Sequence, residues 1–262
     1  MITIWSSGDP AQTMSEDILT DLAPLVAAHP WSQARAKMAV AVLKRMGVHS
    51  PARVLDAGCG WGITLAALEK AGYQATGLDV SRRSLELLDA PGRTLVEANL
   101  AQPPPSDAPL FDAVLALDVI EHLDDDRAAV ANLARFARPG GTVMVSVPAL
   151  PELFSEFDAV QGHRRRYTPD TLVQAFEQSG LVLERMLWWG SWMVPILKRQ
   201  RGARRKKTEG LSPAQVYRQY LNLPPWPGVL ALRAAFRADQ VRTLRWPART
   251  GTSLFALARR PA

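Results

Sequence analysis

Short apolar runs alternate with helix-patterned stretches through the first half of the chain. Strands are predicted at residues 54–56, 74–78, 93–97, 111–117 and 142–147. Helices are predicted between them at residues 63–71, from Ser81 to about Leu88, and at 124–136. The apolar runs are nearly continuous, which is typical of parallel strands with helices on both faces of the sheet. This order predicts a doubly wound α/β fold.

The second half adds two more predicted strands, at residues 181–187 and 252–258. Thr168-Pro169-Asp170 supplies a cap and a first-turn proline for one further helix, and Gly180 closes that helix. The expected sheet is therefore seven-stranded and mostly parallel. We expect one domain over residues 1–262, divided into an N-terminal helical cap (1–50), a core (51–188), a basic helical insert or lid (189–250) and the last strand (251–262).

A glycine-rich turn follows the first predicted strand of the core. Its pattern is D-x-G-x-G-x-G, formed by Asp56, Gly58, Gly60 and Gly62. A dinucleotide fingerprint would need a small residue where Ile63 stands, so the spacing does not fit a dinucleotide. Asp79 ends the next strand, where a carboxylate can accept hydrogen bonds from ribose hydroxyls.

The string VLDAGCGWG around this turn resembles the first motif of the class I S-adenosylmethionine-dependent methyltransferases. The resemblance continues through VEANLAQ, FDAVLALDVIEHLDD and RPGGTVMVSVP, over roughly residues 50–180. It implies a Rossmann-like fold and S-adenosyl-L-methionine as the cofactor. A narrower likeness, carried by DVIEHLDDD and VPALPELFSEFDAVQGHRRRYTPDTL, is to small-molecule enzymes that include quinone-biosynthesis and bacterial biosynthetic-cluster methyltransferases.

The resemblance implies a set of residues that contact the cofactor, although the family often carries Asp where Asn99 stands. These residues are Asp56, Gly58, Gly60, Gly62, Asp79, Val80, Asn99, Leu100, Asp118 and Val119. The segment His29-Pro-Trp31 with Arg35 is similar to the N-terminal cap of the small-molecule group, and we expect these three residues and Trp192 to contact the substrate.

Methyl transfer is an in-line displacement that depends on alignment, so a general base is optional. His163, His122 and Tyr167 are the candidates for a base. The neighbouring Arg164 and Arg166 could clamp an anionic substrate group, or they could belong to a solvated loop. Cys59 is expected to be structural, and no metal site is predicted.

Charge separates the two halves of the chain. Residues 1–150 contain 12 Lys/Arg and 17 Asp/Glu, whereas residues 151–262 contain 19 and 8. The run KRQRGARRKK at 198–207 and the helix predicted at 229–244 concentrate the positive charge. This insert could be a substrate lid or a homodimer surface, or it could contact a membrane peripherally; nucleic-acid binding is the least favoured alternative because no RNA-binding module accompanies the run.

The predicted function is methylation of a small-molecule biosynthetic intermediate, anionic or lipophilic, with oxygen as the favoured acceptor atom. The alternatives are an RNA or protein methyltransferase and a non-catalytic binding protein with the same fold. The first residues lack the pattern of a signal peptide, and the apolar run Met186–Leu197 falls short of the ~20 residues of a membrane span. We therefore expect a cytoplasmic protein, with the inner face of the membrane as the alternative location.

Overall fold

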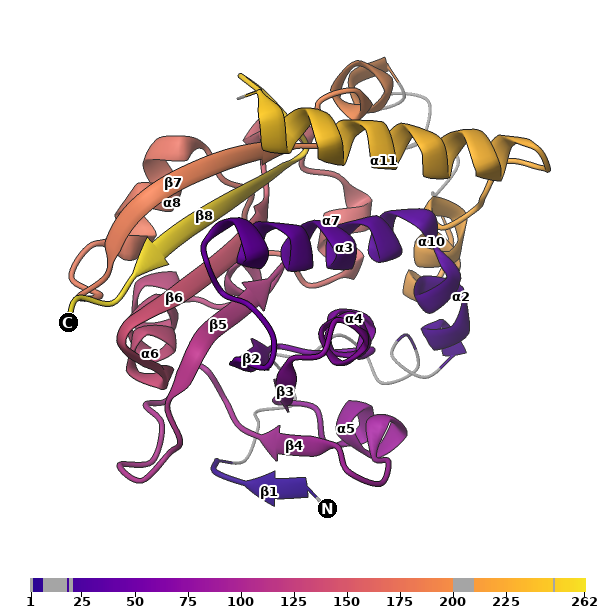
Figure 1. Cartoon of the computed structure of the whole chain (residues 1–262). Helices are drawn as coiled ribbons and strands as arrows, with labels where there is room; N and C mark the ends of the chain where they lie inside the picture. Colours follow the sequence, from indigo (N-terminus) through magenta and orange to yellow (C-terminus); the bar gives the residue numbers. More distant parts are fainter. Residues whose placement is uncertain (1, 7–17, 19–20, 200–209, 247) are drawn as a thin grey trace.

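One eight-stranded sheet forms the centre of the computed structural model, which describes residues 2–6, 18, 21–199, 210–246 and 248–262 (Figure 1). The strand order is β1-β4-β3-β2-β5-β6-β8-β7. All neighbouring pairs are parallel except those made by β8. The strands are β1 (Ile2–Ile4), β2 (Arg53–Ala57), β3 (Gln74–Asp79), β4 (Thr94–Glu97), β5 (Phe111–Leu117), β6 (Ala137–Pro148), β7 (Val182–Trp189) and β8 (Ser253–Arg259).

The expected α/β architecture is confirmed, with one strand more than the seven predicted. The additional strand is β1, which lies at the edge of the sheet and pairs Ile2 with Leu95 of β4. Its three residues are too few to show a hydrophobic period. The N-terminal cap is therefore not wholly helical, because residues 2–4 belong to the sheet, and α2 (Ala23–Ala28) and α3 (Pro30–Arg45) form the helical part.

Helices cover both faces of the sheet. Residues of α6 (Asp126–Phe136) and α8 (Pro169–Phe176) pack on one face, and residues of α3, α4 (Ile63–Lys70) and α11 (Gly228–Arg245) pack on the other. The remaining helices are α5 (Arg82–Leu88), α7 (Glu156–Val160) and α10 (Pro213–Tyr220), with short 3-10 turns η2 (Ile120–His122) and η3 (Pro151–Leu153).

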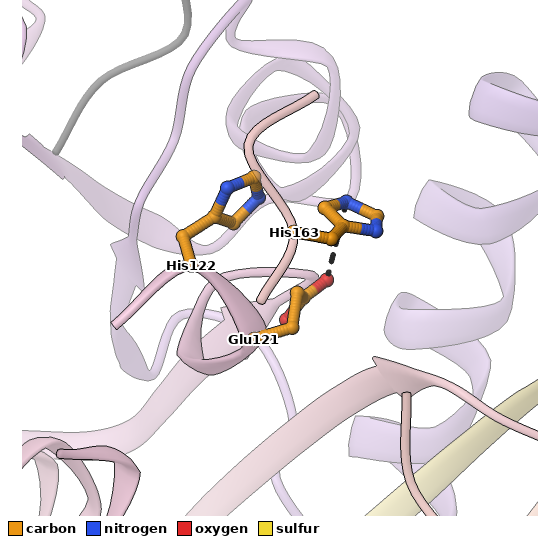
Figure 2. A group of neighbouring side chains, drawn as sticks. All are labelled: Glu121, His122 and His163. Atoms are coloured by element: carbon orange, nitrogen blue, oxygen red, sulfur yellow. Dashed lines mark ion pairs between the residues drawn. The ribbon is translucent and has the colours of Figure 1, made fainter. Parts of the chain in front are cut away.

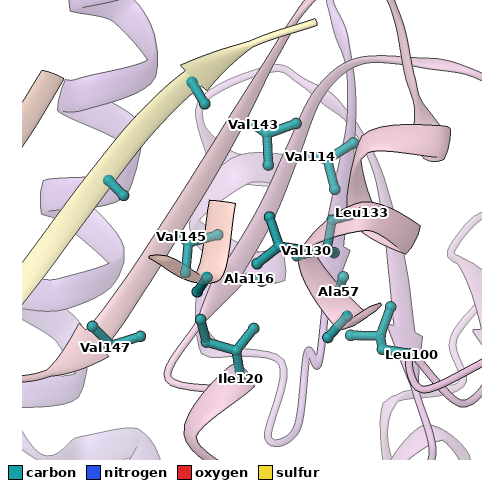
Figure 3. Packing of buried hydrophobic residues seen from close by; sticks show 14 of the residues in the cluster. Ala57, Leu100, Val114, Ala116, Ile120, Val130, Leu133, Val143, Val145 and Val147 are labelled. Carbon is teal, nitrogen blue, oxygen red and sulfur yellow. The ribbon is translucent and has the colours of Figure 1, made fainter. Parts of the chain in front are cut away.

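The position of strand β5 inside the sheet explains why its sequence is continuously apolar. Val114 and Ala116 point into the core under α6 (Figure 3). Leu115 and Leu117 belong to the core under α3. Both faces of the strand are buried, so no polar alternation appears. Truncation of Leu115 or Leu117 to Ala would cost about 2–5 kcal/mol of stability.

Local sequence signals fix most helix ends. Ser81 caps α5 by accepting a hydrogen bond from Ser84 N at 3.2 Å, as the sequence indicated. Helix α6 begins at Asp126 rather than at Asp124, and Asp125 is its cap, accepting from Ala128 N at 2.9 Å. The segment Pro139-Gly140-Gly141 lies inside β6, after the helix has already ended at Phe136.

The basic insert folds over the carboxyl edge of the sheet. Residues 193–199 are helical, α10 packs against α7, and α11 packs against α3 and β7. Most of the basic run at 198–207 lies outside the described residues. Within the described part of the chain, each helix is too short or too polar to cross a lipid bilayer.

Candidate functional site

A cavity of about 510 Å³ opens where strands β2, β3 and β5 end. This is the edge at which parallel α/β sheets bind ligands. Its walls come from the sheet-edge loops, and α2, α3, α10 and α11 contribute residues to its lining. The volume lies within the range of small-molecule sites.

The glycine turn after β2 forms the floor of the cavity. Gly58, Gly60 and Gly62 all have positive φ, at 78°, 47° and 70°. A Cβ on Gly58 would lie 2.4 Å from Val119 Cγ2, and a Cβ on Gly62 would lie 2.6 Å from Leu88 Cδ2. Gly58 and Gly60 line the cavity, whereas Gly62 does not, so the third glycine serves the turn rather than direct contact.

Asp79 joins the turn to β3. Its Oδ2 accepts a hydrogen bond from Gly60 N at 2.8 Å, and its Oδ1 accepts from Ser81 N at 2.9 Å. Burial raises the pKa of Asp79, which these backbone hydrogen bonds oppose. Each carboxylate oxygen can accept more than one hydrogen bond, and Asp79 lines the cavity.

Asp56 lies behind the turn and also lines the cavity. Its Oδ2 is buried and has no hydrogen-bond partner among the described residues. Burial raises its pKa to about 7, with the Arg35 charge lowering and the Asp79 charge raising it. A buried carboxylate oxygen at a cavity wall can accept a hydrogen bond from a bound ligand or from an ordered water.

Asn99 and Leu100 border the cavity after β4, together with Val80. Asn99 Oδ1 accepts from Ala101 N at 2.9 Å, and Asn99 N donates to Ser6 Oγ at 2.8 Å. Ser6 follows β1, so the strand absent from the predicted fold supports this part of the cavity wall. The sequence carried no signal for that contact.

Asp118 ends β5 with a left-handed backbone, φ 57°. Its Oδ1 accepts from Ser146 Oγ at 3.0 Å, and its Oδ2 forms an ion pair with Arg35 of α3. The Arg35 guanidinium also lies over the Trp31 ring, 4.7 Å from its centroid. The cap residues His29, Trp31 and Arg35 therefore reach the same cavity as Asp118 and Val119.

Buried Glu121 and the half-buried His122 and His163 form one group beside the cavity (Figure 2). The two imidazole rings meet edge to face with centroids 4.7 Å apart, and both histidines line the cavity. His163 Nε2 lies 3.9 Å from Glu121 Oε1. Burial, followed by the neighbouring His163, lowers the pKa of His122 to about 4. Ligand atoms of the three residues lie within 4.8 Å of one another, so these residues could hold a metal ion.

Asp158 of α7 orients His163. Its Oδ1 lies 3.1 Å from His163 Nδ1, which favours a proton on that nitrogen, and Nε2 is the nitrogen that lies toward Glu121. Arg166 donates to both Asp158 oxygens, at 2.7 and 3.1 Å. Burial alone would raise the pKa of Asp158, but His163 and Arg166 lower it to about 2.

Two residues assigned to chemistry by the sequence lie away from the cavity. The Tyr167 side chain is buried in the core under α8, donates to Asp126 Oδ2 at 2.7 Å and does not line the cavity, so its geometry does not support the predicted catalytic role. Arg164 points outward, where it pairs with Asp124 at 2.7 Å. Arg164 therefore does not lie at the cavity, as the predicted clamp would require, and Arg166, although it lines the cavity, has its charge neutralised by Asp158.

The insert contributes residues that the sequence did not single out. Tyr217 of α10 lines the cavity, and its ring lies 5.0 Å from that of Phe157 and 6.3 Å from that of Trp61. Trp192, expected to contact substrate, instead packs its ring 5.2 Å from Phe236 and does not line the cavity. Its neighbour Met193 does. A run of adjacent aromatic residues gave no indication of which one points inward.

Comparisons with known proteins agree with this geometry. A family profile described as "Methyltransferase domain" matches residues 31–185, more than half of the chain. A ubiquinone biosynthesis O-methyltransferase of Alkalilimnicola ehrlichii is 35% identical over 103 residues, 36% of this chain and 40% of the relative. An O-methyltransferase of Pyrenophora dematioidea is 29% identical over 160 residues, 58% of this chain and 60% of the relative. These alignments thus span about half the length of the relatives.

Solved structures show the same fold. The complex between the Haloferax volcanii Trm112 methyltransferase activator and a methyltransferase gives a TM-score of 0.61 at 17% identity, covering 98% of this chain and all of that chain. The 4+2 cyclase SpnF gives 0.60 at 18% identity, covering 99% of each chain. At these identities the likeness concerns the fold.

Proposed function

This chain belongs to the methyltransferase domain family, and we propose that it transfers the methyl group of S-adenosylmethionine to an oxygen atom of a small-molecule acceptor. The observation that carries the proposal is the pairing of the glycine turn with Asp79 at a cavity that also holds two histidines. When bound, the cofactor supplies an electrophilic methyl group.

The cofactor side of the cavity is assigned to the sheet-edge residues. The Asp79 carboxylate would accept hydrogen bonds from the ribose hydroxyls, and Asn99, Leu100 and Val80 would border the adenine. Gly58 and Gly60 let the backbone approach the ligand closely. Asp118, held by Arg35 and Ser146, borders the methionine end.

His163 is the proposed general base, with Asp158 as its positioning residue. Asp158 binds His163 Nδ1 and directs Nε2 away from itself, the arrangement in which an acidic residue orients a catalytic histidine. The pKa of His122 is lowered to about 4, so at pH 7 His122 places no positive charge beside the proton that His163 accepts. The acceptor enters against His29 and Trp31 on one side and the insert on the other.

The experiment compares His163→Ala with wild type for methyl transfer to a panel of phenols, carboxylic acids and lipophilic hydroxy compounds, with products detected by mass spectrometry. We expect the variant to lose turnover and to keep its affinity for S-adenosylmethionine in calorimetry. His49→Ala is the matched control, because His49 is exposed and does not line the cavity. Unchanged turnover in His163→Ala would remove the histidine from the mechanism.

A further inference from the structure

Helix α11 presents one continuous side to solvent. Leu230, Arg233, Arg237, Val241 and Arg245 are exposed and follow one another at intervals of three or four residues. This spacing places them on one side of a helix. We call these five residues the outer face of α11; Figure 1 shows α11 lying along the edge of the molecule, with α3 beneath it.

The opposite side of the helix faces inward. Phe236 is buried, and Leu232 and Phe236 both line the cavity. The sequence left the apolar side of this helix open as a cover over the active site or as a membrane contact. The structure turns Leu232 and Phe236 toward the cavity, as the first alternative requires.

The outer face is positively charged without compensation. Arg233, Arg237 and Arg245 form no ion pair with any other described residue. The single acidic residue of the helix, Asp239, is buried and accepts a hydrogen bond from Gly190 N at 2.8 Å. An anionic partner therefore meets three free guanidinium groups along α11 and no carboxylate of that helix.

Exposed tryptophans lie at both ends of the same helix. Trp226 precedes α11 and is 73% exposed, and Trp246 follows it and is 61% exposed. Exposed Leu230 and Val241 lie between them. Tryptophan is enriched where a protein meets the headgroup region of a bilayer, because its ring is apolar and its N–H is polar.

We propose that the outer face of α11, flanked by Trp226 and Trp246, docks on the surface of an anionic lipid bilayer. Alternating arginines and apolar side chains fit phosphate headgroups and the upper acyl region together. A nucleic acid would satisfy the arginines and leave the apolar residues without a role. A second copy packed through this face would place like charges against each other, because a two-fold interface pairs a surface with itself.

Docking in this orientation holds one wall of the cavity at the lipid surface, since the inner side of α11 lines that cavity. Such a position favours an acceptor that partitions into the bilayer. This consequence for the acceptor rests on the proposed methyl transfer, whereas the docking itself does not.

The test is co-sedimentation with vesicles at physiological ionic strength. The full-length protein is expected to bind vesicles of phosphatidylcholine with phosphatidylglycerol and to bind vesicles of phosphatidylcholine alone far more weakly. The variant Arg233→Gln/Arg237→Gln/Arg245→Gln removes three charges. At about 1 kcal/mol for each arginine, its partition coefficient should fall on the order of 100-fold.

The control variant Arg83→Gln/Arg127→Gln/Arg135→Gln removes the same charge from exposed residues of α5 and α6. It should bind the anionic vesicles nearly as wild type does. Equal losses in both variants, or no binding of wild type to anionic vesicles, would overturn the proposal. The proposal would also be overturned if the protein bound single-stranded RNA and the α11 variant lost RNA binding but kept vesicle binding.

Calorimetry with S-adenosylmethionine on the same proteins separates this result from the proposed function. Arg233, Arg237 and Arg245 do not line the cavity, so cofactor affinity should be unchanged in the α11 variant. Loss of vesicle binding with intact cofactor binding supports the docking surface. Vesicle binding that survives in the α11 variant refutes it, whatever the outcome for methyl transfer.

Discussion

The substitution Gly58→Ala tests the glycine turn at its tightest point. The backbone of Gly58 has φ +78°, where a side chain costs about 1–2 kcal/mol. The added Cβ would lie 2.4 Å from Val119 Cγ2 and 3.1 Å from Cγ1, so Val119 must move. Overpacking of this kind costs about 1–3 kcal/mol, which gives a total of about 2–5 kcal/mol lost from the free energy of unfolding.

Gly92→Ala provides the matched control for Gly58→Ala. Gly92 has a similar φ of +82°, but no heavy atom lies within 4 Å of its Cβ position, and it does not line the cavity. Gly92→Ala should lower the free energy of unfolding by the cost of the left-handed backbone alone, about 1–2 kcal/mol. Urea unfolding measures both variants, and calorimetry measures their affinity for S-adenosylmethionine.

The two glycine variants should differ in both assays. Gly58→Ala should be the less stable protein and should bind the cofactor more weakly, because the displaced Val119 lines the cavity. Gly92→Ala should bind the cofactor as wild type does. Equal stability of the two variants, together with wild-type cofactor affinity for Gly58→Ala, would refute the packing argument.

Two further predictions concern individual side chains of the site region. The pKa of His122 is about 4 in the folded protein and 6.5 ordinarily, so the unfolded chain binds more protons between these values. The stabilisation present at pH 7, about 3 kcal/mol, should therefore disappear as the pH falls from 6.5 to 4. Urea unfolding across this range should show that His122→Gln lacks this part of the pH dependence; parallel profiles for variant and wild type would contradict the assignment. Tyr167→Phe should lower stability by about 0.5–1.5 kcal/mol, since Asp126 loses one hydrogen bond, and should leave turnover unchanged; a variant that folds but has lost turnover would return Tyr167 to the mechanism.

The fold was largely predictable because its strands are buried on both faces. Continuous apolar runs such as Phe111–Leu117 mark such strands directly, and the glycine turn fixes where the first helix begins. Strand β1 was missed because three residues carry no period and Ile4 is 62% exposed. Its position depends on pairing with β4, a contact between distant parts of the chain.

Site residues on strand ends and in the glycine turn could be predicted, because the backbone places them at the cavity. Site residues whose contact with the cavity depends on the direction of the side chain were harder to predict. Gly58, Gly60 and Asp79 meet at the cavity because strand ends and turns place them there. Tyr167 and Arg164 are neighbours of His163 in the sequence, yet only His163 faces the cavity. Which way each side chain of that loop points depends on its partners, Asp126, Asp124 and Asp158, and these contacts are not visible in a local pattern.

In the insert, too, the direction in which side chains point could not be predicted from the sequence. Its amphipathic helix was predicted, and its apolar side was open to three interpretations. The structure turns Leu232 and Phe236 toward the cavity and leaves the arginines outside. The packing of α11 on α3 and β7 determines which side of the helix faces the cavity and which side faces solvent.

Calorimetric titration with S-adenosylmethionine tests the central claim most directly. Wild type and Asp107→Asn, a substitution at an exposed position outside the cavity, should bind the cofactor with equal affinity. Asp79→Asn should bind about 10- to 100-fold more weakly, because the amide group replaces one carboxylate oxygen and one hydrogen bond from ribose to a charged group, about 1.5–3 kcal/mol, is lost. Absence of binding by wild type, or equal affinity of Asp79→Asn, would contradict the assignment of this cavity to the methyl donor.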